Sequence, residues 1–295
     1  MLFEDQVLVA PPAMLFRYIG HSAESFFQDP VLRFTSPRFF NDPFELMPVL
    51  APKVTNENLE FLRKHNEIPA SISRRNLREQ IVGILKHDIS HKYGIFCLSE
   101  IPDDLLMWAH YARSHEGCVL GFDRDLLLGL RYKGSPSYAG RVVYTKERQH
   151  IDYPTVHAKE DNLKILFSKG DHWKYEREWR MAVKIPLEAN EKHRDVGCPT
   201  GTIRWVIIGA RAGEVNKKNA YIKAIRKNKN LAHVRILIAH RDPSDFCLRI
   251  SDLSGRSPLN WEKEMLHHSE RKMRSRAKPW YEEAAAARGA QRYHI

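Results

Sequence analysis

Residues 175–180, Tyr-Glu-Arg-Glu-Trp-Arg, bring two carboxylates and a guanidinium together in one short segment. If the segment is a β-strand, alternate side chains share a face, so Glu176, Glu178 and Arg180 point the same way. Carboxylates spaced about 7 Å apart are costly to remove from water unless they are paired or do chemistry. The segment therefore predicts a solvated face, an ion-paired cluster or a catalytic site built on Glu178 and Glu176.

Two further clusters place polar side chains beside predicted strand ends. The first joins Arg17 and Tyr18 to Ser36 and the turn Asn-Asp-Pro-Phe-Glu at 41–45, and the second spans 108–117. Taken singly, each has a structural interpretation, as a turn cap, a helix-dipole partner or, for Trp108, a core residue. Taken together, the clusters predict one pocket whose binding side chains are Arg17, Tyr18, Ser36, Asn41, Asp42, Tyr111 and His115.

Hydrophobic periodicity indicates the elements that must position these residues. Strands are predicted at 14–18, 31–35, 93–98, 118–122, 141–145, 175–181, 204–209 and 234–239. Helices are predicted at 22–28, 71–90, 104–114, 156–167 and 214–227, with Asp42 capping a short helix from Pro43 and Gly117 as a left-handed stop. The segment 204–239 has the length of a parallel strand-helix-strand crossover.

These elements predict an α+β fold, with a mixed β-sheet core and flanking helices. The main domain is expected at 1–255, and a charged helical C-terminal tail, broken near Pro279, at 256–295. No run of 18 apolar residues predicts a membrane span. The acidic start argues against a signal peptide, and the four cysteines form no CxxC pair, so we expect a cytoplasmic protein with no zinc or other metal site.

The net charge of +11 favours an anionic partner. Between Arg211 and Arg235 the chain has eight basic residues and one acidic residue, a local net charge of +7. Residues 271–278 are also basic. Both stretches are candidates for nucleic-acid contact, and a solvated helix face is the alternative for each.

The three clusters also carry a family resemblance. The chain resembles the bacterial domain-of-unknown-function family twenty-nine seventy-one, through Phe-Asn-Asp-Pro-Phe-Glu at 40–45, a Trp-x-x-Tyr helix at 108–111 and Tyr-Glu-x-Glu-Trp-Arg at 175–180. The resemblance spans roughly residues 14 to 240. It implies no particular chemistry.

A more distant resemblance is to ADP-ribosyltransferases, which use an early Arg, then a Ser, then a Glu in a Glu-x-Glu motif. Here the order is Arg17, Ser36 and Glu176-x-Glu178. The resemblance implies that Arg17 anchors NAD as substrate, that Glu178 stabilises the oxocarbenium-like transition state, and that Glu176 lies on the acceptor side. It predicts a toxin-like or defence-related enzyme. Pro37 after Ser36, and Arg180 beside Glu178, depart from the usual pattern.

Two other function classes stay open. A metal-dependent nuclease would hold Mg²⁺ with Asp42, Glu45, Glu176 and Glu178. A non-enzymatic module that binds nucleic acid or protein would instead use these acids in an ion-paired core, neutralised by Arg17 and Arg180.

Overall fold

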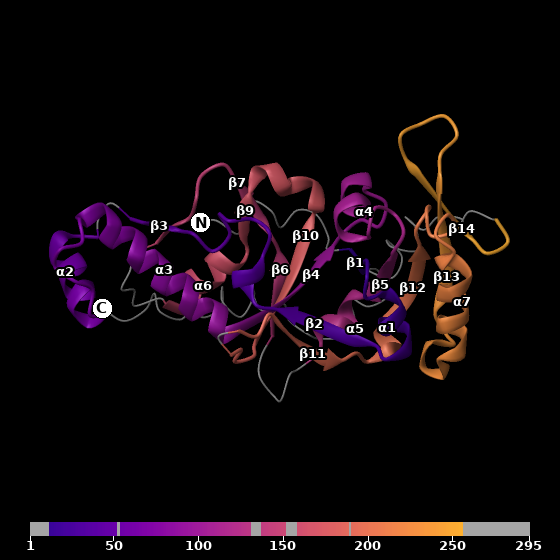
Figure 1. The fold of residues 1–295 in the computed structure, drawn as a ribbon, viewed down its shortest axis with the longest axis horizontal. Coiled ribbons are helices and arrows are strands. Elements are labelled where there is room, and N and C mark those ends of the chain that lie inside the picture. The colour runs from indigo at the N-terminus through magenta and orange to yellow at the C-terminus, as the bar shows by residue number, and fades with distance from the viewer. Residues whose placement is uncertain (1–11, 52–53, 131–136, 152–157, 189, 256–295) are drawn as a thin grey trace, which may run out of the picture. The chain divides into compact units, whose positions relative to one another are not determined.

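The computed structural model describes residues 12–51, 54–130, 137–151, 158–188 and 190–255, and its elements are shown in Figure 1. The predicted tail helix lies outside these residues. The chain divides into two compact units. Among the described residues, the first unit comprises 12–30, 98–130 and 199–255, and the second comprises 31–51, 54–97, 137–151, 158–188 and 190–198. Helices and strands occur in both units, which confirms the predicted α+β class.

The first unit is built on strands in the order β1-β5-β12-β13-β14. Antiparallel β1 and β5 pair Phe16 with Gly121, and β5 pairs antiparallel with β12. The unit contains β1 Met14–Ile19, α1 Ala23–Gln28, α4 Leu105–Tyr111, β5 Cys118–Asp123, α5 Arg124–Leu128, η3 Thr200–Thr202, β12 Ile203–Ile208, α7 Lys217–Lys227, η4 Lys229–Leu231, β13 Arg235–Arg241 and β14 Leu248–Asp252. β5 is buried throughout, which explains its continuous apolar sequence.

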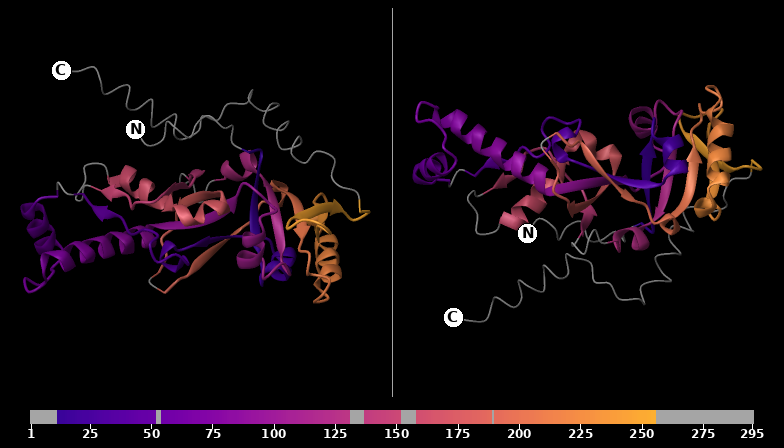
Figure 2. Two further views of the ribbon diagram at one scale, coloured as in Figure 1. Left: turned by 90° about the horizontal axis from the view of Figure 1, so that it is seen from above. Right: turned by 60° about the horizontal axis from the view of Figure 1, so that its bottom comes forward.

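The predicted crossover in the first unit is confirmed. Strands β12 and β13 are parallel, with Val206 opposite Ile236, and α7 connects them. Both views in Figure 2 show the orange helix α7 beside the strands that it joins. Tyr221 and Ile225 form its buried face, and the Tyr221 ring packs edge-on against Phe27 of α1. Helix α7 thus buries one apolar stripe and leaves its basic residues outside.

Trp108 lies at the centre of the second predicted cluster. It is a core residue, which confirms its structural interpretation. It is fully buried, and its indole N–H donates to the carbonyl of Pro102 at 2.8 Å. The Tyr18 ring meets it edge-on at 5.6 Å, and the His115 ring stacks on it at 6.0 Å. The helix α4 begins at its cap Asp104, whose carboxylate accepts from the N–H of Met107, and ends at Tyr111, three residues earlier than predicted.

The turn after α4 corrects the role predicted for Gly117. Three successive residues, Arg113, Ser114 and His115, have positive φ, whereas Gly117 does not. A Cβ at Gly117 would lie 2.1 Å from the carbonyl oxygen of Ile19. Glycine is therefore needed there for close backbone approach and not for a left-handed stop. His115 consequently lies in this turn and not in the last turn of α4.

The second unit contains one linked group of strands and two separate two-stranded sheets, β3-β8 and β7-β9. Its antiparallel β2 and β11 pair Phe34 with Arg194, β2 also pairs with β4, and β10 pairs with β4 and β6. Its elements are β2 Val31–Thr35, η1 Pro37–Phe39, β3 Val49–Leu50, α2 Asn56–His65, α3 Arg74–Lys92, β4 Tyr93–Ser99, β6 Ser137–Arg141, β7 Val143–Thr145, β8 His150–Ile151, α6 Ala158–Leu166, β9 Ser168–Gly170, η2 Asp171–Glu176, β10 Glu178–Lys184 and β11 His193–Gly197. The last residues of β4 belong to the first unit, where Ser99 pairs with Phe16.

Three predictions for the second unit are corrected. The segment 175–181 is not one strand, because the 3₁₀ helix η2 runs to Glu176 and left-handed Arg177 separates it from β10. The chain after Asp42 forms a turn instead of a helix, although the Asp42 carboxylate does accept from the N–H of Phe44. Helix α2 and strand β11 were not predicted: β11 is largely polar, and the helical spacing of Leu59 and Leu62 in α2 was overlooked.

None of the helices in the described ranges combines the length and the apolar character that crossing a membrane requires.

The close approach at Gly117 generates a stability prediction. Gly117→Ala should lower the free energy of unfolding by at least about 1–3 kcal/mol, because its methyl group meets backbone that cannot move away cheaply. Gly83→Ala is the matched control: an added Cβ meets nothing within 4 Å in α3, and alanine should stabilise the helix by about 0.5–1 kcal/mol. Urea denaturation of both variants measures the difference, and equal effects would contradict the assignment.

Candidate functional site

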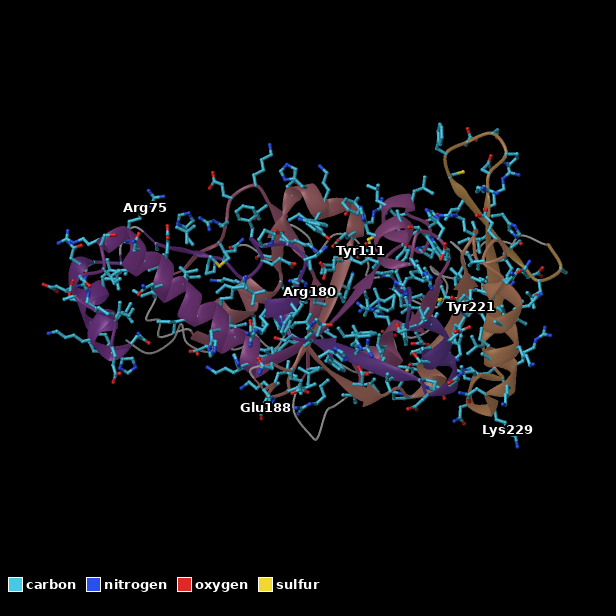
Figure 3. All side chains as sticks on the ribbon, in the orientation of Figure 1. Arg75, Tyr111, Arg180, Glu188, Tyr221 and Lys229 are labelled. Carbon is cyan, nitrogen blue, oxygen red and sulfur yellow. The ribbon has the colours of Figure 1, made fainter. Side chains whose placement is uncertain are left out.

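A cluster of five buried charged side chains lies inside the second unit. Its acids are Glu45, Glu176 and Glu178, and its bases are Lys169 and Arg180. Each is at most 7% exposed, and Arg180 is among the largest fully buried side chains of the described chain. Figure 3 labels Arg180 within the strands of this unit. We call these five residues the charge cluster.

Arg180 is the centre of the charge cluster. Its Nε and Nη2 atoms donate to the two oxygens of Glu178 at 2.8 and 3.0 Å, and Nη1 donates to the carbonyl of Leu166 at 2.6 Å. Nη2 also donates to Glu45. The guanidinium carbon lies 5.2 Å from the centre of the Phe40 ring. All three nitrogens of a desolvated cation are thus satisfied, which is the condition for burying it.

Lys169 supplies the second positive charge. Its ammonium lies 2.6 Å from Glu176, 3.2 Å from Glu178 and 3.9 Å from Glu45. The same nitrogen lies 4.8 Å from the centre of the Trp173 ring. Because burial lowers its pKa less than the three acids raise it, the pKa of Lys169 is raised overall and the side chain stays charged.

The local backbone explains how two acids reach one lysine. Arg177 has φ 42°, a left-handed conformation that a non-glycine residue adopts at a cost of order 1 kcal/mol. This residue turns the chain between η2 and β10, so that Glu176 and Glu178 both meet Lys169. The backbone N–H of Glu178 donates to the hydroxyl of Tyr144 at 2.8 Å. The acids therefore meet through a turn, and not through the strand alternation that the sequence predicted.

Glu178 and Glu45 differ in their protonation behaviour. Burial favours a neutral Glu178, but the charges of Arg180 and Lys169 outweigh burial and lower its pKa to about 2. For Glu45 burial dominates over the same two charges, so its pKa is raised from the ordinary value. Glu178 is therefore fixed as an anion, whereas Glu45 takes up a proton more readily than an ordinary carboxylate.

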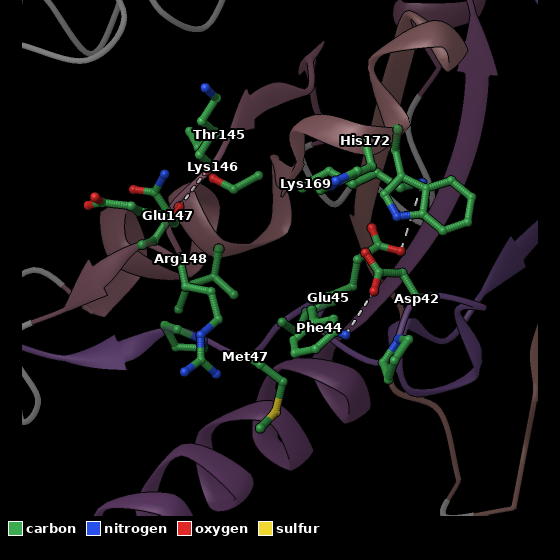
Figure 4. A pocket seen from close by; sticks show the side chains of 18 residues that line it. Asp42, Phe44, Glu45, Met47, Thr145, Lys146, Glu147, Arg148, Lys169 and His172 are labelled. Carbon is green, nitrogen blue, oxygen red and sulfur yellow. Dashed lines mark hydrogen bonds and ion pairs between the residues drawn. The ribbon is translucent and has the colours of Figure 1, made fainter.

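A pocket of about 610 Å³ opens beside the charge cluster in the second unit (Figure 4). Glu45 and Lys169 line it, together with Asp42 and Trp173, and Glu176 and Glu178 are not among its lining residues. Figure 4 shows the segment from Thr145 to Arg148 on the side opposite Asp42 and Glu45. The exposed cations Lys146 and Arg148 on one wall of the pocket thus face a second wall that contains buried carboxylates.

The residues predicted to bind a ligand are divided between the two units. Arg17, Tyr18, Tyr111 and His115 belong to the first unit, where Tyr18 and His115 both contact Trp108. Burial and the nearby charge of Arg211 lower the pKa of His115. In the second unit Asp42 lines the pocket, Asn41 is exposed beside it, and Ser36 is buried and donates to the carbonyl of Ser90. The single pocket joining all of them stays a prediction.

The sequence analysis missed Lys169, which lies in the short strand β9 and belongs to no recognisable motif. Trp173, in η2, carries part of the family resemblance but was not predicted to line a pocket. Glu45 was predicted only as a ligand of Mg²⁺. In the structure its contacts are Lys169 and Arg180, and within the described residues no group of three His, Cys, Asp or Glu side chains is suited to a metal ion. The donor set of the charge cluster therefore does not fit a metal, since cations already occupy its interior.

Fold and site together define an α+β protein with a buried charge cluster beside an open pocket. Residues 107–181 match the family described as "Protein of unknown function (DUF2971)", which confirms the predicted family over this segment. The match includes the Trp108 cluster and residues 175–180, and the Phe-Asn-Asp-Pro-Phe-Glu segment precedes it. No curated protein and no solved structure matches the chain.

The charge cluster generates a second prediction. Glu178→Gln should cost about 3–5 kcal/mol of stability, because it leaves Arg180 and Lys169 buried with too few counter-charges. The control is Arg33→Gln, which removes the half-exposed ion pair with Asp195 in the same unit and should cost about 0–1 kcal/mol. Urea denaturation at neutral pH measures both.

The dependence of the unfolding free energy on pH provides a second test of the same prediction. Because the folded pKa of Glu178 is depressed, its contribution is complete above the unfolded pKa of 4.5 and is lost as pH falls towards 2. Glu178→Gln should flatten this part of the stability profile relative to Arg33→Gln. A wild-type slope retained by Glu178→Gln would contradict the assignment.

Proposed function

We propose that this protein is an ADP-ribosyltransferase-like enzyme that binds NAD as substrate in the pocket of the second unit. The observation that carries the proposal is Glu45, a buried carboxylate with a raised pKa at the wall of a cavity of about 610 Å³. Such cavities have the volume of typical small-molecule sites, and perturbed carboxylates inside them are candidates for catalysis.

The pocket offers the groups that a dinucleotide requires. Lys146 and Arg148 are exposed cations on one wall and suit a pyrophosphate. Trp173 adds half-buried aromatic surface for a planar ring. The charge cluster holds three acids and two bases, so its formal charge is −1 when all are ionised, which favours the cationic nicotinamide ring on that side.

The chemistry assigns different roles to the three acids. In the transfer reaction the bond from ribose to nicotinamide breaks, its electron pair leaves with the nicotinamide nitrogen, and positive charge develops on the ribose. The acceptor then bonds to the same carbon and loses a proton. Glu45, as a carboxylate at the pocket wall, would stabilise that charge. Glu176 and Glu178 would act as positioning residues, because they hold the Lys169 and Arg180 that contact Glu45.

A direct test compares two glutamates of the same pocket. Wild-type protein incubated with NAD should release nicotinamide, and Glu45→Gln should reduce the rate roughly 100-fold or more, the scale on which one stabilising group acts. Glu147→Gln, on the other wall, should change the rate little. Because the raised pKa means that a neutral Glu45 is tolerated, Glu45→Gln should cost less stability than Glu178→Gln. Absence of NAD turnover, alone and with cell extract, would refute the proposal.

The pH dependence of this activity supplies a further prediction. The carboxylate of Glu45 stabilises positive charge only when ionised, so activity should fall as pH drops through its pKa. Since burial raises that pKa, the acid limb should lie above the ordinary carboxyl value of 4.5. The rate of nicotinamide release measured against pH checks this, and a limb at or below 4.5 would assign the reactive carboxylate elsewhere.

A non-enzymatic nucleotide-binding module is the second candidate. It is favoured by the neutralisation of Glu176 and Glu178 by Lys169 and Arg180, which is the arrangement of an ion-paired core. In that case NAD would raise the melting temperature of the protein without releasing nicotinamide. The two readouts, thermal shift and nicotinamide release, separate the candidates in one experiment.

A further inference from the structure

Helix α7 presents a strongly basic surface on the first unit. Its 11 residues, Lys217–Lys227, include five Lys or Arg and no acidic residue. Tyr221 and Ile225 face the core, whereas Lys223, Arg226 and Lys227 are exposed. Such a density of like charge is self-repulsive, and it is the usual electrostatic footprint of an anionic partner.

Ion pairs neutralise only one end of this surface. Lys217 binds Glu24 at 2.9 Å, and Arg211 binds Glu214 at 3.0 Å. Across the described parts of the chain, no ion pair is formed by Lys218, Lys223, Arg226, Lys227 or Lys229. Favourable interaction with the helix dipole accounts for Arg226 and Lys227 in the last turn of α7, but not for Lys218 or Lys223.

The hairpin between β13 and β14 exposes an aromatic ring to solvent. Phe246, in the connecting turn, is 101% exposed. The turn is ordered by Asp242, whose carboxylate accepts from the backbone N–H groups of Ser244 and Asp245 at 2.8 and 3.0 Å and from Arg249. These hydrogen bonds lower the pKa of Asp242, so it stays ionised. Phe246 is therefore presented by a structured turn.

The hairpin and α7 form one continuous surface. Arg241, at the end of β13, lies 3.4 Å from Glu214, which precedes α7. Burial and the charge of Lys218 lower the pKa of His240, which places Lys218 beside β13. In Figure 1 α7 runs away from the base of the hairpin, and Figure 3 labels Lys229 beyond its far end. The helical part of the surface is about 16 Å long.

We infer that this surface binds single-stranded nucleic acid, with phosphates along α7 and an unpaired base stacked on Phe246. Cations that follow a backbone, combined with an exposed aromatic ring, form the usual site for single strands, because every base has a face that stacks. A duplex would offer phosphates to α7 but no free base to Phe246. The proposal is independent of NAD binding in the second unit.

The experiment uses the full chain and a fluorescent oligothymidine of about 12 nucleotides, within the usual site size. The triple variant Lys223→Gln, Arg226→Gln, Lys227→Gln should raise Kd roughly tenfold or more and reduce the salt slope by about 2, since each phosphate contact contributes about 0.7. The charge-matched control, Lys64→Gln, Arg74→Gln, Arg75→Gln, alters three exposed residues of α2 and α3 and should leave Kd unchanged. Equal weakening by the control would show binding by overall charge alone and would overturn the site.

Phe246→Ala tests the aromatic contact and removes no buried contact. It should raise Kd for the single strand roughly tenfold, as expected for one lost stacking interaction, and change duplex binding little. Phe61→Ala, at an aromatic that is 60% exposed on α2, is its control. Unchanged single-strand affinity in Phe246→Ala, or no salt-sensitive binding by the wild type, would overturn the proposal.

Discussion

The second unit depends on the burial of one guanidinium. Arg180 is 1% exposed, and a charge removed so completely from water requires counter-charges and acceptors on every side. Glu178 supplies two acceptor oxygens from the same strand, Leu166 supplies a carbonyl, and Glu45 supplies a second carboxylate from a distant turn. Glu176 and Glu178, on either side of left-handed Arg177, both contact Lys169, whose positive charge offsets the carboxylates that Arg180 alone does not neutralise.

The contacts with Arg180 give Glu178 and Glu45 different environments. A carboxylate with both oxygens held by Arg180, such as Glu178, is well suited to fixing geometry and poorly available to a ligand. Glu45 has the opposite character, since it lines the pocket and burial raises its pKa. The position of Arg180 beside Glu178, a departure from the usual transferase motif, is thus consistent with a positioning role for Glu178 and a reactive role for Glu45.

Local periodicity was a good guide to the elements and a poor one to the contacts between them. The strands β1, β2, β4 and β5, the helix α3 and the β12-α7-β13 crossover lie close to their predicted residues, because each has a continuous apolar run or an apolar face with period 2 or 3.6. The polar strand β11 has no such face, whereas the apolar face of α2, Leu59 and Leu62, was overlooked. The strand predicted at 175–181 is wrong, because the backbone at Arg177 is left-handed. Nothing in the sequence indicates this conformation, since arginine is not a residue type that favours it.

The sequence by itself determined the α+β class, the family match over residues 107–181, the burial of Trp108 and the basic character of α7, and it left ion pairing and catalysis as alternatives for Glu176 and Glu178. Only the tertiary structure decided that these acids share Lys169, that Arg180 joins Glu178 to Glu45, and that the pocket borders Glu45 instead of Glu178. The physical reason is that hydrophobic patterning is set by neighbours along the chain. The pairing of buried charges is set by segments as far apart as residues 45 and 180, and only folding brings those together.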